Sequence, residues 1–192
     1  MKEQPSELII KVREGDRDAC RRLYLQYAPR LMATCTRYIP DRDDAEDVLQ
    51  EALVKIFSSI RRLDYRGEAA LFGWMKRIVA NESLMFLRRQ RKMLVFESPE
   101  VLPDLPEDDD PPPRVPPEVV QRLIQELPDG YRAVFNLAVF EELPHTEIAS
   151  LLGISPSTSA SQFHRARALL RRKIESYLRT EEEGITTKGR TQ

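Results

Sequence analysis

Residues 44–60 read DAEDVLQEALVKIFSSI, and this stretch decides how the first half of the chain folds. Its apolar residues recur at the spacing of an amphipathic helix and form one continuous face. They are Ala45, Val48, Leu49, Ala52, Leu53, Ile56, Phe57 and Ile60. On the other side, Asp47, Gln50 and Glu51 are three and four residues apart, so they lie next to one another on the helix surface. Together with Asp44 they form an acidic patch that suits a basic protein partner.

A loop over residues 64–68 separates this helix from a second amphipathic pattern, which predicts a helix that runs on to residue 92. The spacing directs five apolar residues inward, namely Leu71, Trp74, Met75, Ile78 and Val79. Residues 61–92 carry nine basic and three acidic side chains. This excess of positive charge favours contact with a phosphate backbone. One helix therefore presents an acidic surface and the next a basic one.

The composition favours a protein built from helices alone. The chain has 192 residues with only 7 Gly, and no β-branched run alternates with polar residues. The 30 basic and 31 acidic side chains nearly cancel, so the placement of charge is more informative than the net charge. There is no signal-peptide pattern, and no apolar run approaches the ~20 residues of a membrane span. We therefore expect a cytoplasmic protein in which Cys20 and Cys35 are reduced.

A proline-rich acidic segment divides the chain. Residues 97–117 hold eight prolines and seven acidic side chains against a single arginine. Proline removes backbone donors and like charges repel, which predicts an extended linker over residues 94–117. The linker is either a solvated spacer or an acidic strip that mimics nucleic acid in a basic channel. It separates a domain of residues 1–93 from one of residues 118–180, and we expect residues 181–192 to be a disordered tail.

In the second domain, residues 145–172 carry the pattern of a helix-turn-helix. An apolar stripe precedes Gly153, which can take the left-handed conformation that ends a helix. Ser155 or Ser157 then caps the next helix, which we expect to end near Arg179. The inward positions of this helix leave five polar side chains outward, of the kind that read base edges. They are Thr158, Ser161, Gln162, His164 and Arg165. Basic residues follow and suit phosphate contacts, so this motif predicts DNA binding.

No arrangement typical of an enzyme or a cofactor site is found in the sequence. His145 and His164 have no cysteine or carboxylate partner at metal-binding spacing, which predicts surface residues. The sequence also lacks a nucleophile with its base, a glycine-rich phosphate loop and metal-spaced carboxylates. We therefore expect no enzymatic activity, no metal and no cofactor.

Seven short motifs, in this order, resemble the extracytoplasmic-function (ECF) group of bacterial RNA polymerase sigma factors. They are DAEDVLQE (44–51), YRGE (65–68), FGWMKRIVAN (72–81), LP (127–128) followed by Arg132 and Phe135, EIA (147–149), LGIS (152–155) and RAR (165–167). The resemblance covers nearly the whole chain. The chain departs from the residue types common in that group at five positions, namely Leu84, Met85, Ser157, Ser159 and Ala160. The promoter sequence is therefore not predicted.

The resemblance implies an all-α protein with two small helical domains, sigma region 2 and sigma region 4, joined by the flexible acidic linker. The first domain would bind core RNA polymerase through the acidic patch of Asp44, Asp47, Gln50 and Glu51. It would recognise and melt the minus-ten promoter element through Tyr65, Arg66, Lys76, Arg77, Asn81, Arg88, Arg89, Arg91 and Lys92. The second would read the minus-thirty-five element through Ser157, Thr158, Ser161, Gln162, His164, Arg165, Arg167 and Arg171. The implied partners are core RNA polymerase, promoter DNA and an anti-sigma factor, without membrane insertion.

Two other classes of function explain fewer of the residues. An autonomous helix-turn-helix regulator would bind DNA without polymerase, and the acidic patch and the basic residues 61–92 would then have no purpose. A nuclease would need metal-spaced carboxylates, which the sequence lacks.

Overall fold

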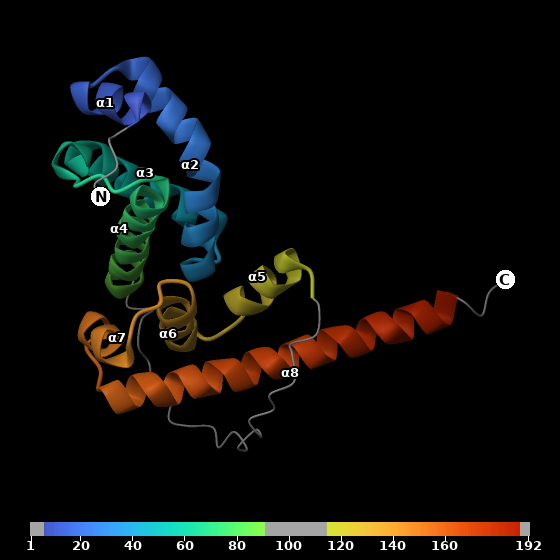
Figure 1. The fold of residues 1–192 in the computed structure, drawn as a ribbon. Helices are drawn as coiled ribbons and strands as arrows, with labels where there is room; N and C mark the ends of the chain where they lie inside the picture. Colours follow the sequence, from blue (N-terminus) through green and yellow to red (C-terminus); the bar gives the residue numbers. More distant parts are fainter. Residues whose placement is uncertain (1–5, 91–114, 189–192) are drawn as a thin grey trace. The chain divides into compact units, whose positions relative to one another are not determined.

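The computed structural model of the protein describes residues 6–90 and 115–188, with side chains described as far as residue 180. Within these ranges the chain forms eight α-helices, one short 3-10 helix and no strand (Figure 1). It divides into two compact units, Met1–Met93 and Leu94–Gln192, called here the N-terminal and C-terminal units. The expected all-α fold is therefore confirmed. The predicted linker lies outside the described residues except at 115–117, where Pro117 already begins a helix.

The N-terminal unit consists of four α-helices and the short helix η1 (Ile60–Arg62). The α-helices are α1 (Glu7–Glu14), α2 (Arg17–Tyr38), α3 (Arg42–Ser59) and α4 (Glu68–Arg89). The last three pack against one another, and α1 packs on α2 and η1 (Figure 1). Each of these three helices contributes buried residues to the core, for example Leu31 of α2, Ile56 of α3 and Met75 of α4. Trp74 and Ile78, which the spacing directs inward, are only partly buried.

Aspartate side chains cap two of these helices. The sequence pattern offers Asp16 or Asp18 as the cap of the helix after Gly15, and Asp41 or Asp43 as the cap of the acidic helix. Asp16 Oδ1 accepts a hydrogen bond from the Ala19 N–H at 2.7 Å, and Asp41 Oδ1 accepts one from the Asp44 N–H at 3.0 Å. Each carboxylate replaces a backbone partner that the first turn of a helix lacks. Gly15, with a φ of 87°, ends α1 in the left-handed conformation.

One predicted helix boundary is wrong. The sequence pattern predicts a short helix through Tyr27 and a separate helix with Pro29 in its first turn, but Pro29 lies inside the continuous helix α2. Proline in a helix interior removes one hydrogen bond and crowds the preceding turn. Buried residues on both sides of Pro29, among them Leu23, Leu31 and Cys35, nevertheless pack as one face of α2. Their burial outweighs the local penalty.

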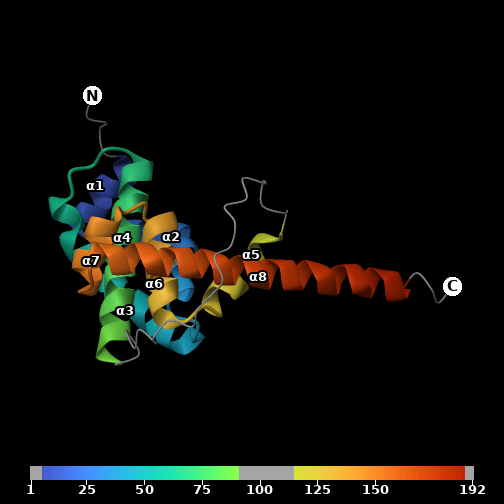
Figure 2. The ribbon, with the colours of Figure 1, turned by 90° about the horizontal axis from the view of Figure 1, so that it is seen from below.

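The C-terminal unit contains α5 (Pro117–Gln125), α6 (Asp129–Val139), α7 (His145–Leu152) and α8 (Pro156–Lys188). The three shorter helices pack against the first part of α8, and the rest of α8 extends beyond them (Figure 2). A cluster of buried residues from α5, α6, α8 and the turn between α5 and α6 forms the core of this unit. It consists of Leu123, Ile124, Leu127, Phe135, Ala166 and Leu170.

The end of α8 also differs from the prediction. We expect this helix to end near Arg179 and residues 181–192 to be a disordered tail, but α8 continues to Lys188. Residues 189–192 lie outside the described residues. Residues 181–183 are three glutamates, which have high helix propensity, and extending an existing helix is easier than starting one. Polarity alone therefore does not predict where this helix ends.

Arg132 holds the turn between α5 and α6. Its buried guanidinium donates hydrogen bonds to the carbonyl oxygens of Gln125 at 3.0 Å and Leu127 at 2.6 Å, and it pairs with Asp129. Burial lowers the pKa of Arg132, and the charge of Asp129 acts in the opposite direction. The side chain thus satisfies carbonyls that the end of α5 leaves without a helical partner.

We predict that Arg132→Met lowers the free energy of unfolding of the C-terminal unit by about 2–4 kcal/mol, because it leaves two carbonyls and a carboxylate without their donor. Hydrogen exchange of peptides from residues 117–139 in the full chain measures this loss. Arg122→Met, on an exposed position of α5, is the matched control and changes the unfolding free energy by less than about 0.5 kcal/mol. Equal exchange in the two variants would contradict the role of Arg132.

Candidate functional site

The acidic patch is an exposed surface of α3. Asp47, Gln50 and Glu51 are exposed and Asp44 is half-buried, while the opposite face of the helix is in the core. Val54 is 70% exposed and lies one turn beyond Gln50, so an apolar side chain extends the patch. The helical spacing already separates Val54 from the apolar face, because it lies four residues after Gln50.

An apolar groove lies next to the patch, between α2 and α3. Its volume is about 380 Å³, and the residues that line it include Gln50, which also belongs to the acidic patch. The full lining is Tyr24, Leu25, Ala28, Pro29, Met32, Glu46, Leu49, Gln50 and Leu53. The sequence analysis missed this groove, because its two walls are 14 or more positions apart in the sequence.

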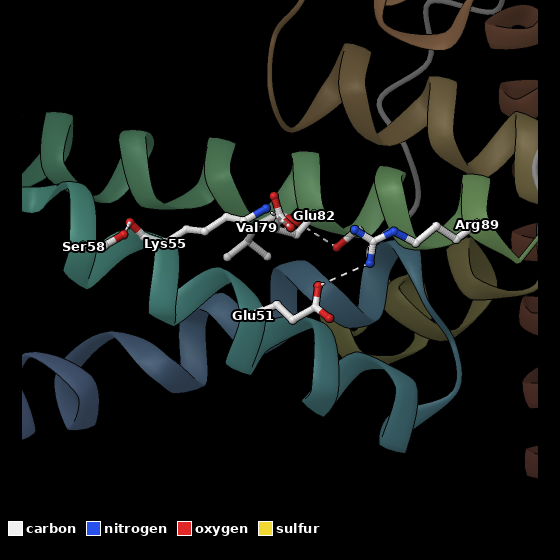
Figure 3. Close-up of polar contacts among 7 residues, drawn as sticks. Glu51, Lys55, Ser58, Val79, Glu82 and Arg89 are labelled. Atoms are coloured by element: carbon white, nitrogen blue, oxygen red, sulfur yellow. Dashed lines mark hydrogen bonds and ion pairs between the residues drawn. The ribbon is translucent and has the colours of Figure 1, made fainter.

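Two ion pairs join α3 to α4 (Figure 3). Lys55 Nζ lies 2.5 Å from Glu82 Oε2, and only 6% of the Glu82 side chain is exposed. Glu51 Oε2 lies 3.7 Å from Arg89 Nη1, and both of these side chains are more than half exposed. The buried Glu82 needs its lysine, because an unpaired buried charge is strongly destabilising. The second pair joins a residue of the acidic patch to a residue of the basic helix.

The basic residues of α4 form an exposed stripe. Arg77, Asn81 and Arg88 are four and seven residues apart, so they lie on one side of the helix, and all three are exposed. Met85, another exposed side chain, lies in the same stripe. Arg89 is exposed beside the stripe and Lys76 is half-buried. Arg91 and Lys92 lie outside the described residues.

Tyr65 is not presented to solvent as expected. Its side chain is 8% exposed and belongs to the core of the N-terminal unit, whereas the neighbouring Arg66 is exposed and pairs with Asp64 at 2.9 Å. Alternate residues of this extended loop point to opposite sides, and Gly67, with a φ of 99°, then turns the chain into α4. A base cannot stack on Tyr65 while its ring stays in the core.

The turn between α7 and α8 has the predicted helix-turn-helix geometry. Gly153 ends α7 in the left-handed conformation with a φ of 70°. Ser155 is the cap of α8, because its Oγ accepts a hydrogen bond from the Thr158 N–H at 3.0 Å. His145 Nδ1 lies 2.9 Å from Ser159 Oγ, and its ring contacts Phe163. His145 is therefore half-buried and joins the two helices, which corrects its prediction as a surface residue.

The residues of α8 that are predicted to contact the minus-thirty-five element differ in how exposed their side chains are. Ser157, Ser161, His164 and Arg167 are exposed, and Thr158, Arg165 and Arg171 are half-buried, with Arg171 paired to Glu175 at 3.1 Å. Gln162 is 3% exposed, which contradicts its predicted outward position. It shares a helix face with the buried Ser159 and Ala166, three residues before it and four after it, so it points into the unit.

Metal-ligating and reactive side chains are few among the described residues. Among them, no three His, Cys, Asp or Glu side chains lie close enough together to hold a metal ion. Burial raises the pKa of Cys35 to about 12, although a hydrogen bond with Ser83 lowers it, so this thiol is protonated at neutral pH. In the same part of the chain, no helix is both long enough and apolar enough to cross a membrane.

Comparisons with known proteins match both units. Residues 23–93 match the family described as Sigma-70 region 2, and residues 118–170 match the one described as Sigma-70, region 4. The RNA polymerase sigma-H factor of Pseudomonas aeruginosa is 29% identical, over 92% of this chain and 97% of that protein. The ECF RNA polymerase sigma-E factor of Escherichia coli (strain K12) is 29% identical, over 90% of this chain and 95% of that protein.

A solved structure titled "Structure of CnrH in complex with the cytosolic domain of CnrY" also aligns with this chain. It is 20% identical, with a TM-score of 0.46, over 88% of this chain and 96% of that chain.

We predict that Lys55→Met lowers the free energy of unfolding of the N-terminal unit by about 3–5 kcal/mol, because it leaves the buried Glu82 charge unpaired. Adding Glu82→Leu to this variant restores most of the lost stability, since a well-packed apolar pair replaces the ion pair. Lys11→Met removes the exposed pair with Glu7 and leaves the denaturation midpoint unchanged, because solvent screens that pair. Chemical denaturation monitored by Trp74 fluorescence measures all three. A double variant as unstable as Lys55→Met would contradict this account.

Proposed function

The chain belongs to the sigma-70 family, in its ECF group, and we propose that its two units divide the task of promoter selection between them. As a member of this group it directs RNA polymerase to promoters for transcription initiation. One observation supports the assignment of residues below. The N-terminal unit carries an exposed acidic patch on α3 and an exposed basic stripe on α4, and ion pairs hold these two helices together.

The acidic patch is the proposed contact with core polymerase. Asp47, Gln50 and Glu51 offer carboxylate and amide acceptors side by side, and Asp44 adds charge one turn earlier. A basic helical surface, such as the polymerase clamp coiled coil, fits this arrangement electrostatically. The Glu51–Arg89 pair does not prevent docking, because an exposed ion pair contributes at most about 1 kcal/mol.

The basic stripe of α4 is the proposed contact with the minus-ten element. Arg77 and Arg88 supply charge for phosphates, and Asn81 supplies amide groups that can hydrogen-bond an unpaired base. Five further residues complete the proposed surface, namely Arg66, Lys76, Arg89, Arg91 and Lys92. The buried Tyr65 shapes the loop in this proposal, and it contacts a flipped base only if promoter binding draws its ring out of the core.

The first turns of α8 are the proposed contact with the minus-thirty-five element. A recognition helix places the residues near its N-terminus against base edges in the major groove. The residues assigned to this contact are Ser157, Thr158, Ser161, His164, Arg165, Arg167 and Arg171. Gln162 is left out because its side chain is buried.

We also propose that an anti-sigma factor regulates the protein by covering its polymerase-binding surface. The apolar groove and the exposed side chains of Leu25 and Val54 lie beside the acidic patch and offer such a protein area to bury. In this proposal the chain is a regulatory subunit without catalytic activity of its own, and it acts in the cytoplasm.

Reversing Asp47 and Glu51 to lysine is predicted to weaken binding to core polymerase by more than about 100-fold, because like charges in an interface cost several kcal/mol. The circular dichroism spectrum stays unchanged, since both side chains are exposed. Glu14→Lys with Asp18→Lys changes the net charge equally at exposed positions outside the patch and leaves binding intact. Undiminished retention of the Asp47/Glu51 variant on immobilised core enzyme would refute the assignment.

Arg165→Ala is predicted to weaken binding of the reconstituted holoenzyme to its promoter by about 1–3 kcal/mol and to relax the sequence preference at one base pair. Gln162→Met conserves volume at a buried position and leaves the preference unchanged. A series of single-base promoter variants measures both. If Gln162→Met alters the sequence preference and Arg165→Ala does not, then Gln162 reads the base pair and the assignment of Arg165 is wrong.

A specific mobility shift of duplex promoter DNA by the free chain would instead favour an autonomous regulator.

A further inference from the structure

An arginine outside the basic stretch is held in place by an aromatic ring. Arg30, an exposed residue of α2, places its Cζ 3.7 Å from the ring centroid of Phe72 on α4. The Phe72 ring also stacks on Tyr27, with ring centroids 6.0 Å apart and an interplanar angle of 21°. Tyr27 is buried, so it anchors Phe72, and Phe72 in turn supports the guanidinium.

This contact leaves the hydrogen-bonding edge of Arg30 available. A guanidinium that lies face-on against a ring still directs its N–H groups outward, in the fork geometry that matches a phosphate. In the described part of the chain, Arg30 forms no ion pair with a carboxylate. Arg42, Arg66 and Arg89, by contrast, pair with Glu46, Asp64 and Glu51.

Arg30 lies beside the loop proposed to contact the minus-ten element. Phe72 is four residues after Glu68, one turn from the start of α4, so Arg30 on its ring lies near the loop that leads into this helix. Lys76 is four residues after Phe72, so it lies on the same side of α4. A cation from α2 thus adds to those that the loop and α4 contribute.

We propose that Arg30 binds a backbone phosphate of the promoter strand next to residues 64–67, and that Phe72 positions its guanidinium. This inference rests on the proposed minus-ten surface and extends it to α2. The ring restricts a side chain that otherwise loses considerable conformational entropy on binding, so the contact forms at a smaller entropic penalty. Because a phosphate is the same at every base pair, the contact strengthens binding without reading sequence.

The test measures the affinity of holoenzyme, reconstituted with core polymerase, for a promoter fork probe over a series of salt concentrations. Arg30→Gln removes one phosphate contact, so the slope of log K against log salt becomes shallower by about 0.7–0.9. The affinity falls roughly tenfold, equally for all promoter sequences. Arg30→Lys keeps the charge and the slope but loses part of the affinity. Phe72→Leu also keeps the slope and weakens binding about two- to fivefold, because it removes the support for the guanidinium.

Arg21→Gln is the matched control. Arg21 is an exposed arginine of the same helix, nine residues earlier, which is about two and a half turns away and so on the opposite side. We expect Arg21→Gln to leave both the slope of log K against log salt and the affinity for the probe unchanged. Equal retention of all variants on core polymerase shows that the differences arise from DNA.

Arg77→Gln separates this inference from the proposed function. One outcome is that Arg77→Gln makes the slope of log K against log salt shallower while Arg30→Gln leaves it unchanged. In that case Arg30 does not bind a phosphate, and the proposed minus-ten surface of α4 is retained. If neither variant changes the slope, the minus-ten surface itself is wrong. An affinity loss in Arg30→Gln that is the same at every salt concentration means that Arg30 only packs on Phe72, and this also overturns the inference.

Discussion

The ion pair between Lys55 and Glu82 fixes the geometry on which the N-terminal unit depends. Glu82 is almost fully enclosed between α3 and α4, where an unpaired carboxylate would strongly destabilise the fold, and Lys55 Nζ lies 2.5 Å from it. The pair therefore favours one placement of α4 along α3. Since the acidic patch belongs to α3 and the basic stripe to α4, this pair and the apolar packing of the two helices together set how the surfaces proposed for polymerase and for promoter DNA are placed.

This arrangement explains how a chain with a formal net charge of −1 can serve two highly charged partners. Charge of each sign is collected on its own helix face, so each surface attracts one partner while the sum stays close to zero. Helices suit this separation, because residues three or four positions apart form a stripe whose composition is independent of the stripe behind it. The Glu51–Arg89 pair marks the border between the two surfaces.

The differences between sequence and structure concern single residues whose local preference is outweighed by the packing around them. Tyr65 has the residue type and loop position of a base-stacking group, but the core beside Tyr27 takes up its ring. Gln162 has the polarity of a base-reading group, but the period of α8 places it on the face of Ser159 and Ala166. At Pro29, packing on both sides keeps α2 continuous. In each case burial of the surrounding apolar surface outweighs the local preference of one residue.

The sequence by itself determined the all-α class, the turn at Gly153 and the acidic and basic faces of two successive helices, and it narrowed two helix caps to Asp16 or Asp18 and to Asp41 or Asp43. All of these depend on residues within about four positions of one another, where helical spacing relates sequence directly to space. Only the tertiary structure decided the groove between α2 and α3, the Lys55–Glu82 pair, the stacking of Arg30 on Phe72 and the burial of Tyr65. These features join segments that are far apart in the chain or lie in an irregular loop. Their geometry follows from how whole helices pack, which no local spacing encodes.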